Sequence, residues 1–214
     1  MLKREAYQDR ESWLAGRGNS IGASEAAAVV GLSPFETAYE LWQRKTGRTR
    51  DKDLSGSSAV EYGNRLEPAM RTMFQAEHPE LTLEYHQFDV LYREERPWMS
   101  ATLDGELTDA EGRKYVLEIK TAQVGKKTQY DKWRDAIPTN YLCQCCHQLL
   151  VTGWEGVYLY AKLVKLNGDS ELKTYLITAE EHKGDMEWLM KEEAMFWESN
   201  VKAGVPPKTI LPGL

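Results

Sequence analysis

The sequence contains no uninterrupted apolar run of 18 residues in its 214 positions, so we expect no membrane-spanning helix. Its opening segment, MLKREAYQDRESW, is polar and lacks the apolar stretch of a signal peptide. Only three cysteines are present, and they argue against both a disulfide framework and a C-x-x-C zinc site because they lie so close together. These absences favour a protein of a reducing cytoplasm. The cysteines are Cys143, Cys145 and Cys146.

Positive charge is also in short supply, because 27 Lys and Arg residues face 33 Asp and Glu residues, for a net charge of -6. This balance argues against a protein that coats nucleic acid through bulk positive charge. The charge is unevenly spread, however, and residues 113–134 hold seven basic against two acidic residues. The sequence therefore predicts a local basic strip that would contact nucleic acid at a few points only.

Hydrophobic residues make up 42% of the sequence and charged residues 28%, which is typical of folded globular proteins. No internal repeat or low-complexity segment interrupts it. The most loop-like stretch, residues 48–58, is too short to require a domain boundary. We therefore predict a single domain over residues 1–214.

Helices are predicted where apolar residues recur at helical spacing next to capping signals. Ser33 and Glu36 form one expected capping box, and Thr178 and Glu181 form another. Pro68 is expected to kink or restart the second helix. The predicted helices cover residues 33–45, 59–77, 138–152 and 178–204.

Strands are predicted where apolar and polar residues alternate. A polar turn at residues 108–112 and the Asn167-Gly168 pair each indicate a hairpin. The alternation slips near Gln87. The fold class is therefore α/β (α+β), a mostly antiparallel or mixed sheet of about five strands flanked by helices. The predicted strands cover residues 81–93, 98–107, 114–121, 155–166 and 171–177.

The first of these hairpins carries the residues of most chemical interest. Asp104 ends its first strand, and Glu118 and Lys120 lie two apart on its second. Side chains two apart on a strand share one face, so Glu118 and Lys120 project together while Leu117 and Ile119 face the core. Asp104 can reach the same place from the paired strand. Two close carboxylates suit a hard divalent cation such as Mg²⁺.

A Glu-x-Lys pair is open to two interpretations. On an exposed sheet face it is a weak surface ion pair of no functional consequence. Beside a metal ion, Lys120 would orient or deprotonate a bound water, or stabilise charge on a phosphate.

The wider pattern favours the second interpretation. Asp104-Gly, a hairpin and Glu118-x-Lys120 resemble the PD-(D/E)XK nuclease core, with Thr102-Leu103-Asp104 in place of Pro-Asp. Together with further motifs, the pattern resembles the YqaJ-type phage recombinases, relatives of the phage lambda exonuclease, from about residue 13 to residue 153. These motifs are WLAGR at 13–17, IGASEAA at 21–27, GLSPF at 31–35, GNRLEP at 63–68, and Gln144 with HQLL at 147–150.

This resemblance implies a restriction-endonuclease-like fold and a Mg²⁺-dependent (or Mn²⁺-dependent) 5′→3′ exonuclease, with two ions per active site when DNA is bound. Such an enzyme degrades one strand of linear double-stranded DNA and leaves a 3′ single-stranded tail. A phage annealing protein then binds that tail for recombination. The resemblance also implies a ring-shaped homotrimer and a phage or prophage protein acting in the cytoplasm of a bacterial host.

The resemblance assigns roles to individual residues. Asp104, Glu118, the Ile119 carbonyl and Glu67 match the metal-binding positions, the three acids also counting as catalytic, and Lys120 matches the catalytic lysine. Other matches concern the DNA: Arg17, Ser24 and Thr102 for a 5′-phosphate pocket, Gln144 for a helix glutamine facing the active site, and Lys126 for a contact with the DNA end.

Alternative functions share the same core. A restriction-like endonuclease would cut closed circular DNA, and a Cas4-like nuclease would need a fourth cysteine for its iron–sulfur cluster. A non-catalytic DNA-binding module is disfavoured by intact Asp104, Glu118 and Lys120. His147 would either line the cleft or be a core histidine with a backbone partner, and we favour the core.

Overall fold

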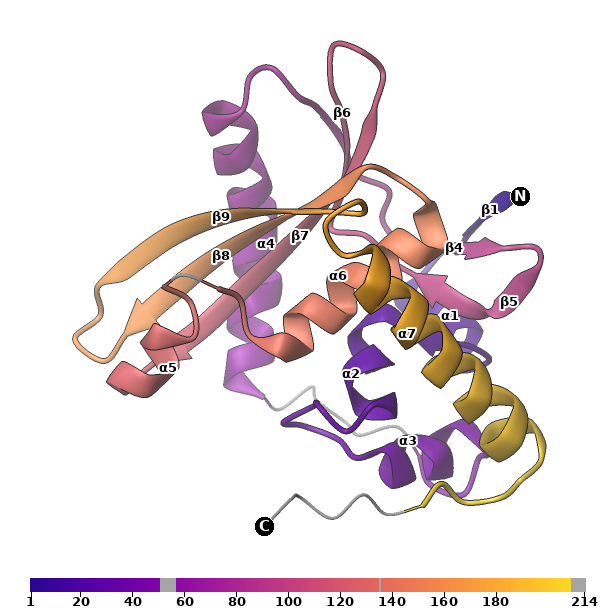
Figure 1. Ribbon diagram of the computed structural model, residues 1–214. Helices are drawn as coiled ribbons and strands as arrows, with labels where there is room; N and C mark the ends of the chain where they lie inside the picture. Colours follow the sequence, from indigo (N-terminus) through magenta and orange to yellow (C-terminus); the bar gives the residue numbers. More distant parts are fainter. Residues whose placement is uncertain (51–56, 135, 209–214) are drawn as a thin grey trace.

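The computed structural model describes residues 1–50, 57–134 and 136–208, and it contains two mixed sheets with helices around them (Figure 1). Most of the loop predicted at residues 48–58 falls on residues 51–56, outside the described residues. The larger sheet has the strand order β3-β6-β7-β8-β9, and the smaller has the order β1-β4-β5-β2. The predicted sheet of about five strands is therefore confirmed, while the second sheet was not predicted.

The larger sheet is built around its longest strand, β7 (Lys114–Val124). β7 pairs antiparallel with β6 (Gly105–Thr108) and parallel with β8 (Gly156–Lys165), which pairs antiparallel with β9 (Ser170–Thr178). Both predicted hairpins are thus confirmed. Parallel neighbours need a crossover connection, and α6 (Thr139–Thr152) supplies it between β7 and β8.

One edge of β7 is only partly paired. The β6 partner runs from Thr108 opposite Lys114 to Gly105 opposite Leu117 and goes no further. The β8 pairing on the other edge continues to Val124. Within the described residues, the β6-side edge of β7 beyond Leu117 has no strand partner, and it is here that Glu118 and Lys120 lie.

Two helices cover opposite faces of the larger sheet (Figure 1). On one face, Phe74 of α4 (Ser58–Glu77) packs in a core with Leu117 and Ile119. On the other face, Leu149 of α6 packs with Val116. This division confirms the predicted alternation of β7.

The remaining elements complete the smaller sheet and its surroundings. The smaller sheet carries β1 against β4, and α6 packs against both β4 and β5. The strands are β1 (Leu2–Ala6), β2 (Ile21–Gly22), β3 (Thr82–Glu84), β4 (Asp89–Arg93) and β5 (Arg96–Ala101). The helices are α1 (Arg10–Arg17), the 3₁₀ turn η1 (Ala23–Glu25), α2 (Ala26–Val29), α3 (Ala38–Lys45), α5 (Lys127–Asp131), α7 (Lys183–Met195) and the π-helix η2 (Phe196–Lys202).

Two predicted strands are wrong as single elements. The segment 81–93 forms β3 in the larger sheet and β4 in the smaller one. The chain changes sheet at Phe88, which has a positive φ of 64° and breaks the extended run. The segment 98–107 likewise divides at residues 102–104 into β5 and β6, which belong to different sheets.

Two predicted helix starts are also wrong. α3 begins at Ala38 because Thr37 caps it, accepting a hydrogen bond from Glu40 N at 3.2 Å, whereas Ser33 caps only a turn. α7 begins at Lys183, although the Thr178 hydroxyl still accepts from Glu181 N at 3.3 Å. α4 continues through Pro68 without restarting.

His147 is a core histidine with a backbone partner, as predicted. Its ring is fully buried on α6, with Nδ1 2.9 Å from a carboxylate oxygen of Glu193 and Nε2 3.0 Å from the carbonyl of Ser100. A carboxylate and a carbonyl are both acceptors, an arrangement that favours the ring with both nitrogens protonated. Burial alone lowers the pKa of His147, but the Glu193 carboxylate and the Ser100 carbonyl outweigh burial and raise it.

This raised pKa predicts a pH dependence of stability. The stabilisation is complete below the ordinary pKa of about 6.5 and is lost as the pH rises through the higher pKa of the folded state. We expect His147→Gln to remove this decline in the free energy of unfolding, measured by urea denaturation from pH 6 upward. His86→Gln, at a half-exposed position, is the control and keeps it. An unchanged decline in His147→Gln would contradict the assignment.

Candidate active site

Asp104 lies just before β6, beside the open edge of β7. Its Oδ2 accepts a hydrogen bond from the backbone N–H of Ile119 at 2.7 Å. The following Gly105 allows this close approach, because a Cβ there would lie 3.2 Å from the Cβ of Leu117. The Asp-Gly pair thus places a carboxylate beside the strand that carries Glu118 and Lys120.

Glu118 is a buried carboxylate with three hydrogen-bond donors. Its side chain is 3% exposed. Oε1 accepts from Gln144 Nε2 at 2.7 Å and lies 2.6 Å from Lys120 Nζ. Oε2 accepts from Gln148 Nε2 at 2.5 Å. The two glutamines are one turn apart on α6, so one helix holds both oxygens.

Lys120 is a cation in this arrangement. Burial by itself lowers the pKa of Lys120, but the neighbouring carboxylates of Glu118 and Asp104 outweigh it and raise the pKa above its usual value. Its amino group also lies 5.3 Å from the ring centroid of Tyr141, within the range of a cation–π contact. Lys120 is therefore charged at neutral pH in this structure and acts as a donor.

The surroundings of Asp104 disfavour its charged form, whereas those of Lys120 favour the charged form. Burial and the nearby carboxylates of Glu118 and Glu67 raise the pKa of Asp104 well above its usual value, against the lowering effects of Lys120 and the Ile119 N–H. Glu67, on α4, is therefore one of the charges that act on Asp104. The three acids repel one another and would be relieved by a cation.

Glu67 has a cationic partner that the sequence did not reveal. Arg71, one turn further along α4, forms an ion pair with Glu67 and donates to the Asp104 carbonyl at 3.2 Å. Its guanidinium carbon lies 3.6 Å from the ring centroid of Tyr85. Arg71 therefore ties α4 to the start of β6.

The donor set fits a hard divalent cation. Carboxylates and the backbone at Ile119 are oxygen donors of the kind that Mg²⁺ prefers, and Mg²⁺ needs only one or two carboxylates when water and phosphate complete its shell. In the described part of the chain no three His, Cys, Asp or Glu side chains form a ready metal-binding group. Glu118 and Glu67 contact protein donors instead, Glu118 the Lys120 ammonium and Glu67 the Arg71 guanidinium.

Arg17 and Thr102, two of the three residues matched to a 5′-phosphate pocket, both contact Trp13. Trp13 Nε1 donates to Thr102 Oγ1 at 3.2 Å, across 89 positions of sequence. The guanidinium carbon of Arg17 lies 4.6 Å from a ring centroid of the same tryptophan. Trp13 therefore links α1 to the segment that leads into Asp104.

Ser24, the third matched residue, lies on the 3₁₀ turn η1. A Cβ at Gly22 would be 3.3 Å from Arg17 Nη2, so the guanidinium lies against Gly22, two residues before Ser24. The Ser24 side chain, on η1, is exposed. The three residues thus gather on one side of the molecule around Arg17.

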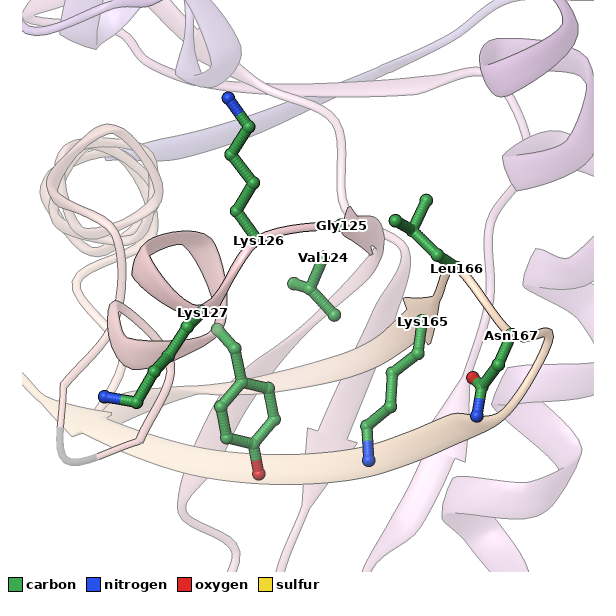
Figure 2. A pocket seen from close by; sticks show the side chains of 8 residues that line it. Val124, Gly125, Lys126, Lys127, Lys165, Leu166 and Asn167 are labelled. Atoms are coloured by element: carbon green, nitrogen blue, oxygen red, sulfur yellow. The ribbon is translucent and has the colours of Figure 1, made fainter.

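Lys126 lies at the far end of β7, away from the acids. It is exposed, precedes α5, and lines an open basic pocket together with Lys127 and Tyr130 of α5 and Lys165 of β8. Figure 2 shows the Lys126 side chain extending away from those of Lys127 and Lys165. The structure therefore places Lys126 two residues beyond the strand that carries Glu118, at the start of α5.

The three cysteines are buried and free on α6. Burial raises the pKa of the Cys143 thiol to about 11 and that of Cys146 to about 12. Thiols of this kind are poor nucleophiles and poor metal ligands. Their burial on α6 makes them packing residues of the core.

The sequence contained weak signals for the partners it missed. Arg71 follows Glu67 by four residues, and Gln148 follows Gln144 by four, which is the spacing of neighbours on one helix face. No local pattern indicated that Trp13 would contact Thr102. Partners within a helix can be found by spacing, whereas partners across the fold cannot.

Solved structures share this fold. The alkaline exonuclease LHK-Exo of Laribacter hongkongensis aligns with a TM-score of 0.64 at 16% identity, over 92% of this chain and 94% of its own. A phage-related exonuclease of Haemophilus somnus 129PT aligns with a TM-score of 0.56 at 12% identity, over 86% and 96%. At these identities the likeness shows the fold alone.

The sequence comparison defines the family. The YqaJ-like viral recombinase domain family matches residues 12–155, so the chain belongs to that family. An uncharacterized protein named YqaJ from Bacillus subtilis (strain 168) is 29% identical over 208 residues, which cover 97% of this chain and 61% of that protein. The chain thus spans about three fifths of that relative's length. Among the described residues, no helix is long and apolar enough to cross a membrane.

The raised pKa of Asp104 predicts that its ionised carboxylate lowers the free energy of unfolding of the protein. An acid with a raised pKa destabilises the fold above its unfolded pKa of about 3.9. Asn keeps an acceptor for Ile119 N–H and removes the charge. We expect Asp104→Asn to raise the Tm, measured by calorimetry at pH 8 in the presence of a chelator. The Tm should rise by about 2–4 °C for each ~1 kcal/mol of charge repulsion that the substitution removes.

A matched control lies in the adjacent hairpin. Hydrogen bonds and charge from Arg113 outweigh desolvation and lower the pKa of Asp109. We therefore expect Asp109→Asn to lower the Tm. Equal shifts of one sign in both variants would contradict the charge repulsion at Asp104.

Proposed function

We propose that this chain is a nuclease domain that degrades one strand of linear double-stranded DNA in the 5′→3′ direction, with Mg²⁺ or Mn²⁺ as cofactor. The observation that carries the proposal is the meeting of Asp104, Glu118 and Lys120 at the unpaired edge of β7, with Glu67 facing them from α4. Membership of a viral recombinase family and the fold shared with exonucleases support it.

The carboxylates would hold the cofactor. Asp104, Glu118, Glu67 and the Ile119 carbonyl would supply oxygen ligands for one ion, or for two when DNA is bound. A bound divalent cation supplies charge for the phosphate and a water of lowered pKa. The remaining chemistry depends on the side chains around it.

Lys120 and the glutamines would prepare the attack. The Lys120 ammonium, held 2.6 Å from Glu118 Oε1, would donate to a phosphate oxygen or orient the attacking water. Gln144 would hold the Glu118 carboxylate in place from α6. These groups sit on a strand and a helix packed together, so the geometry is set before DNA arrives.

Arg17, Ser24 and Thr102 would hold the 5′-phosphate. A guanidinium gives two parallel hydrogen bonds to phosphate, and hydroxyls add further contacts. Trp13 supports Arg17 and Thr102 at once, which keeps the two at a fixed separation. Lys126, exposed beyond the end of β7, would contact the DNA backbone rather than the scissile bond.

The product would be a 3′ single-stranded tail. We further propose that a phage annealing protein binds this tail for recombination, that the chain assembles as a homotrimeric ring, and that it acts in the bacterial cytoplasm. A ring around DNA would keep the enzyme on its substrate through many cuts.

A direct assay tests this function. We expect Mg²⁺-dependent loss of linear duplex carrying a 5′-phosphate, no loss in chelator, and intact closed circular DNA, measured by gel electrophoresis. Lys120→Ala should slow the reaction about 10²–10⁴-fold because it removes the donor. Lys114→Ala, on the same strand but away from the acids, is the control and keeps activity. Cutting of closed circles would indicate an endonuclease, and persistence of every DNA a non-catalytic module.

The phosphate pocket makes a separate prediction. We expect Arg17→Ala to reduce kcat/KM about 10- to 100-fold on 5′-phosphorylated ends only, because a hydrogen bond to a charged group contributes about 1.5–3 kcal/mol. Arg10→Ala, on the exposed start of α1, is the control. Equal rates on phosphorylated and unphosphorylated ends in the unaltered protein would contradict the pocket.

A further inference from the structure

Gln148 contacts the Glu118 carboxylate from a position that the motif comparison left without a role. Its amide nitrogen donates to Oε2 of Glu118 at 2.5 Å, while Gln144 donates to Oε1 at 2.7 Å. The two glutamines share one face of α6. A single helix face therefore holds both oxygens of one carboxylate and prevents its rotation.

The contact between Gln148 and Glu118 leaves another polar atom of Gln148 buried without a partner, which lowers the stability of the fold. Gln148 is fully buried, and its Oε1 has no hydrogen-bond partner within the described residues. A buried acceptor without a partner loses its hydrogen bonds to water on folding and gains none in return, which destabilises the fold. The adjacent residues Leu149 and Val151 are buried and apolar, and an apolar side chain at 148 would avoid the cost. The donor to Glu118 is thus the feature that an apolar residue would lose.

The two oxygens of Glu118 are not equally held. Oε1 has two donors, Gln144 and Lys120, whereas Gln148 is the one described donor to Oε2. Gln148 is also neutral, so it adds no counter-charge at Oε2, whereas the Lys120 ammonium lies at Oε1. Oε2 is therefore the oxygen that is held by a neutral donor alone among the described residues.

We propose that Gln148 is a positioning residue that sets the orientation of the Glu118 carboxylate for a hard divalent cation. By holding Oε2 with a single N–H it would leave the second lone pair of that oxygen available to a cation. Groups that orient a metal ligand typically change metal affinity or activity 10- to 100-fold when removed. The inference rests on the proposed function, since the cation is the nuclease cofactor.

The test measures metal binding without DNA. We expect Gln148→Met, which keeps the side-chain length and removes the donor, to weaken Mn²⁺ binding about 10- to 100-fold by titration calorimetry. The Mg²⁺ concentration giving half-maximal cleavage should rise by the same factor, with KM for DNA at saturating Mg²⁺ within about twofold. Gln144→Met should weaken binding less, because Lys120 still holds Oε1.

A structural glutamine provides the matched control. The amide of Gln75, on α4, donates to the Leu81 carbonyl at 2.7 Å and accepts from Leu83 N at 3.0 Å, so it only braces a turn. We expect Gln75→Met to lower the Tm and leave the Mn²⁺ Kd unchanged. The same result for Gln148→Met would assign Gln148 to packing and overturn the inference.

Two further outcomes separate this inference from the proposed function. If the unaltered protein binds no Mn²⁺ and cleaves no DNA, the proposed function fails. If the unaltered protein binds and cleaves while Gln148→Met binds equally well, the positioning role alone fails. Gln148→Leu repeats the test with a second apolar side chain, and unfolding of both variants in chelator, seen by circular dichroism, would also overturn the inference.

Discussion

A buried carboxylate, that of Glu118, is the constraint on which the arrangement of this protein depends. Its side chain is 3% exposed, and a charge removed from water to that extent must be matched by donors or a counter-ion. The protein supplies three donors, two from α6 and one from β7 itself. Helix α6 therefore contacts β7 through polar as well as apolar side chains. The amides of Gln144 and Gln148 help to fix the position of α6 along β7.

Strand β7 contributes to a core on each face of the larger sheet because its side chains alternate. Leu117 and Ile119 face α4, while Val116 faces the core under α6. The pairing of β6 with β7 begins at Gly105, opposite Leu117, and the edge of β7 beyond Leu117 is open. The acids collect there for a geometric reason, since Asp104 immediately precedes β6 and Glu67 lies on α4. A site in this position has packed cores on both sides and an open approach along one strand edge.

The charges of the site are unfavourable to one another, and the surrounding cations compensate only in part. Burial and two neighbouring carboxylates raise the pKa of Asp104, although Lys120 lies beside them. Proteins tolerate such local conflicts at functional sites and offset them elsewhere in the fold. The basic strip at residues 113–134 is likewise not one surface. Arg113 pairs with Asp109 in the hairpin turn, Lys120 is enclosed in the site, and Lys126 is exposed beyond β7.

The sequence by itself determined the local features: the Glu118-x-Lys120 alternation, both hairpins, and the end of α6 at Gly153, which has a φ of 71°. Alternation, turn residues and caps act over a few positions, so a local pattern specifies them. Tertiary structure alone decided that residues 81–93 and 98–107 each divide between two sheets, that Trp13 bridges to Thr102, and that Gln148 reaches Glu118. These contacts join residues 30 to 89 positions apart or depend on which sheet a strand joins. They are set by chain closure and by the burial of a whole core, and no short pattern records either.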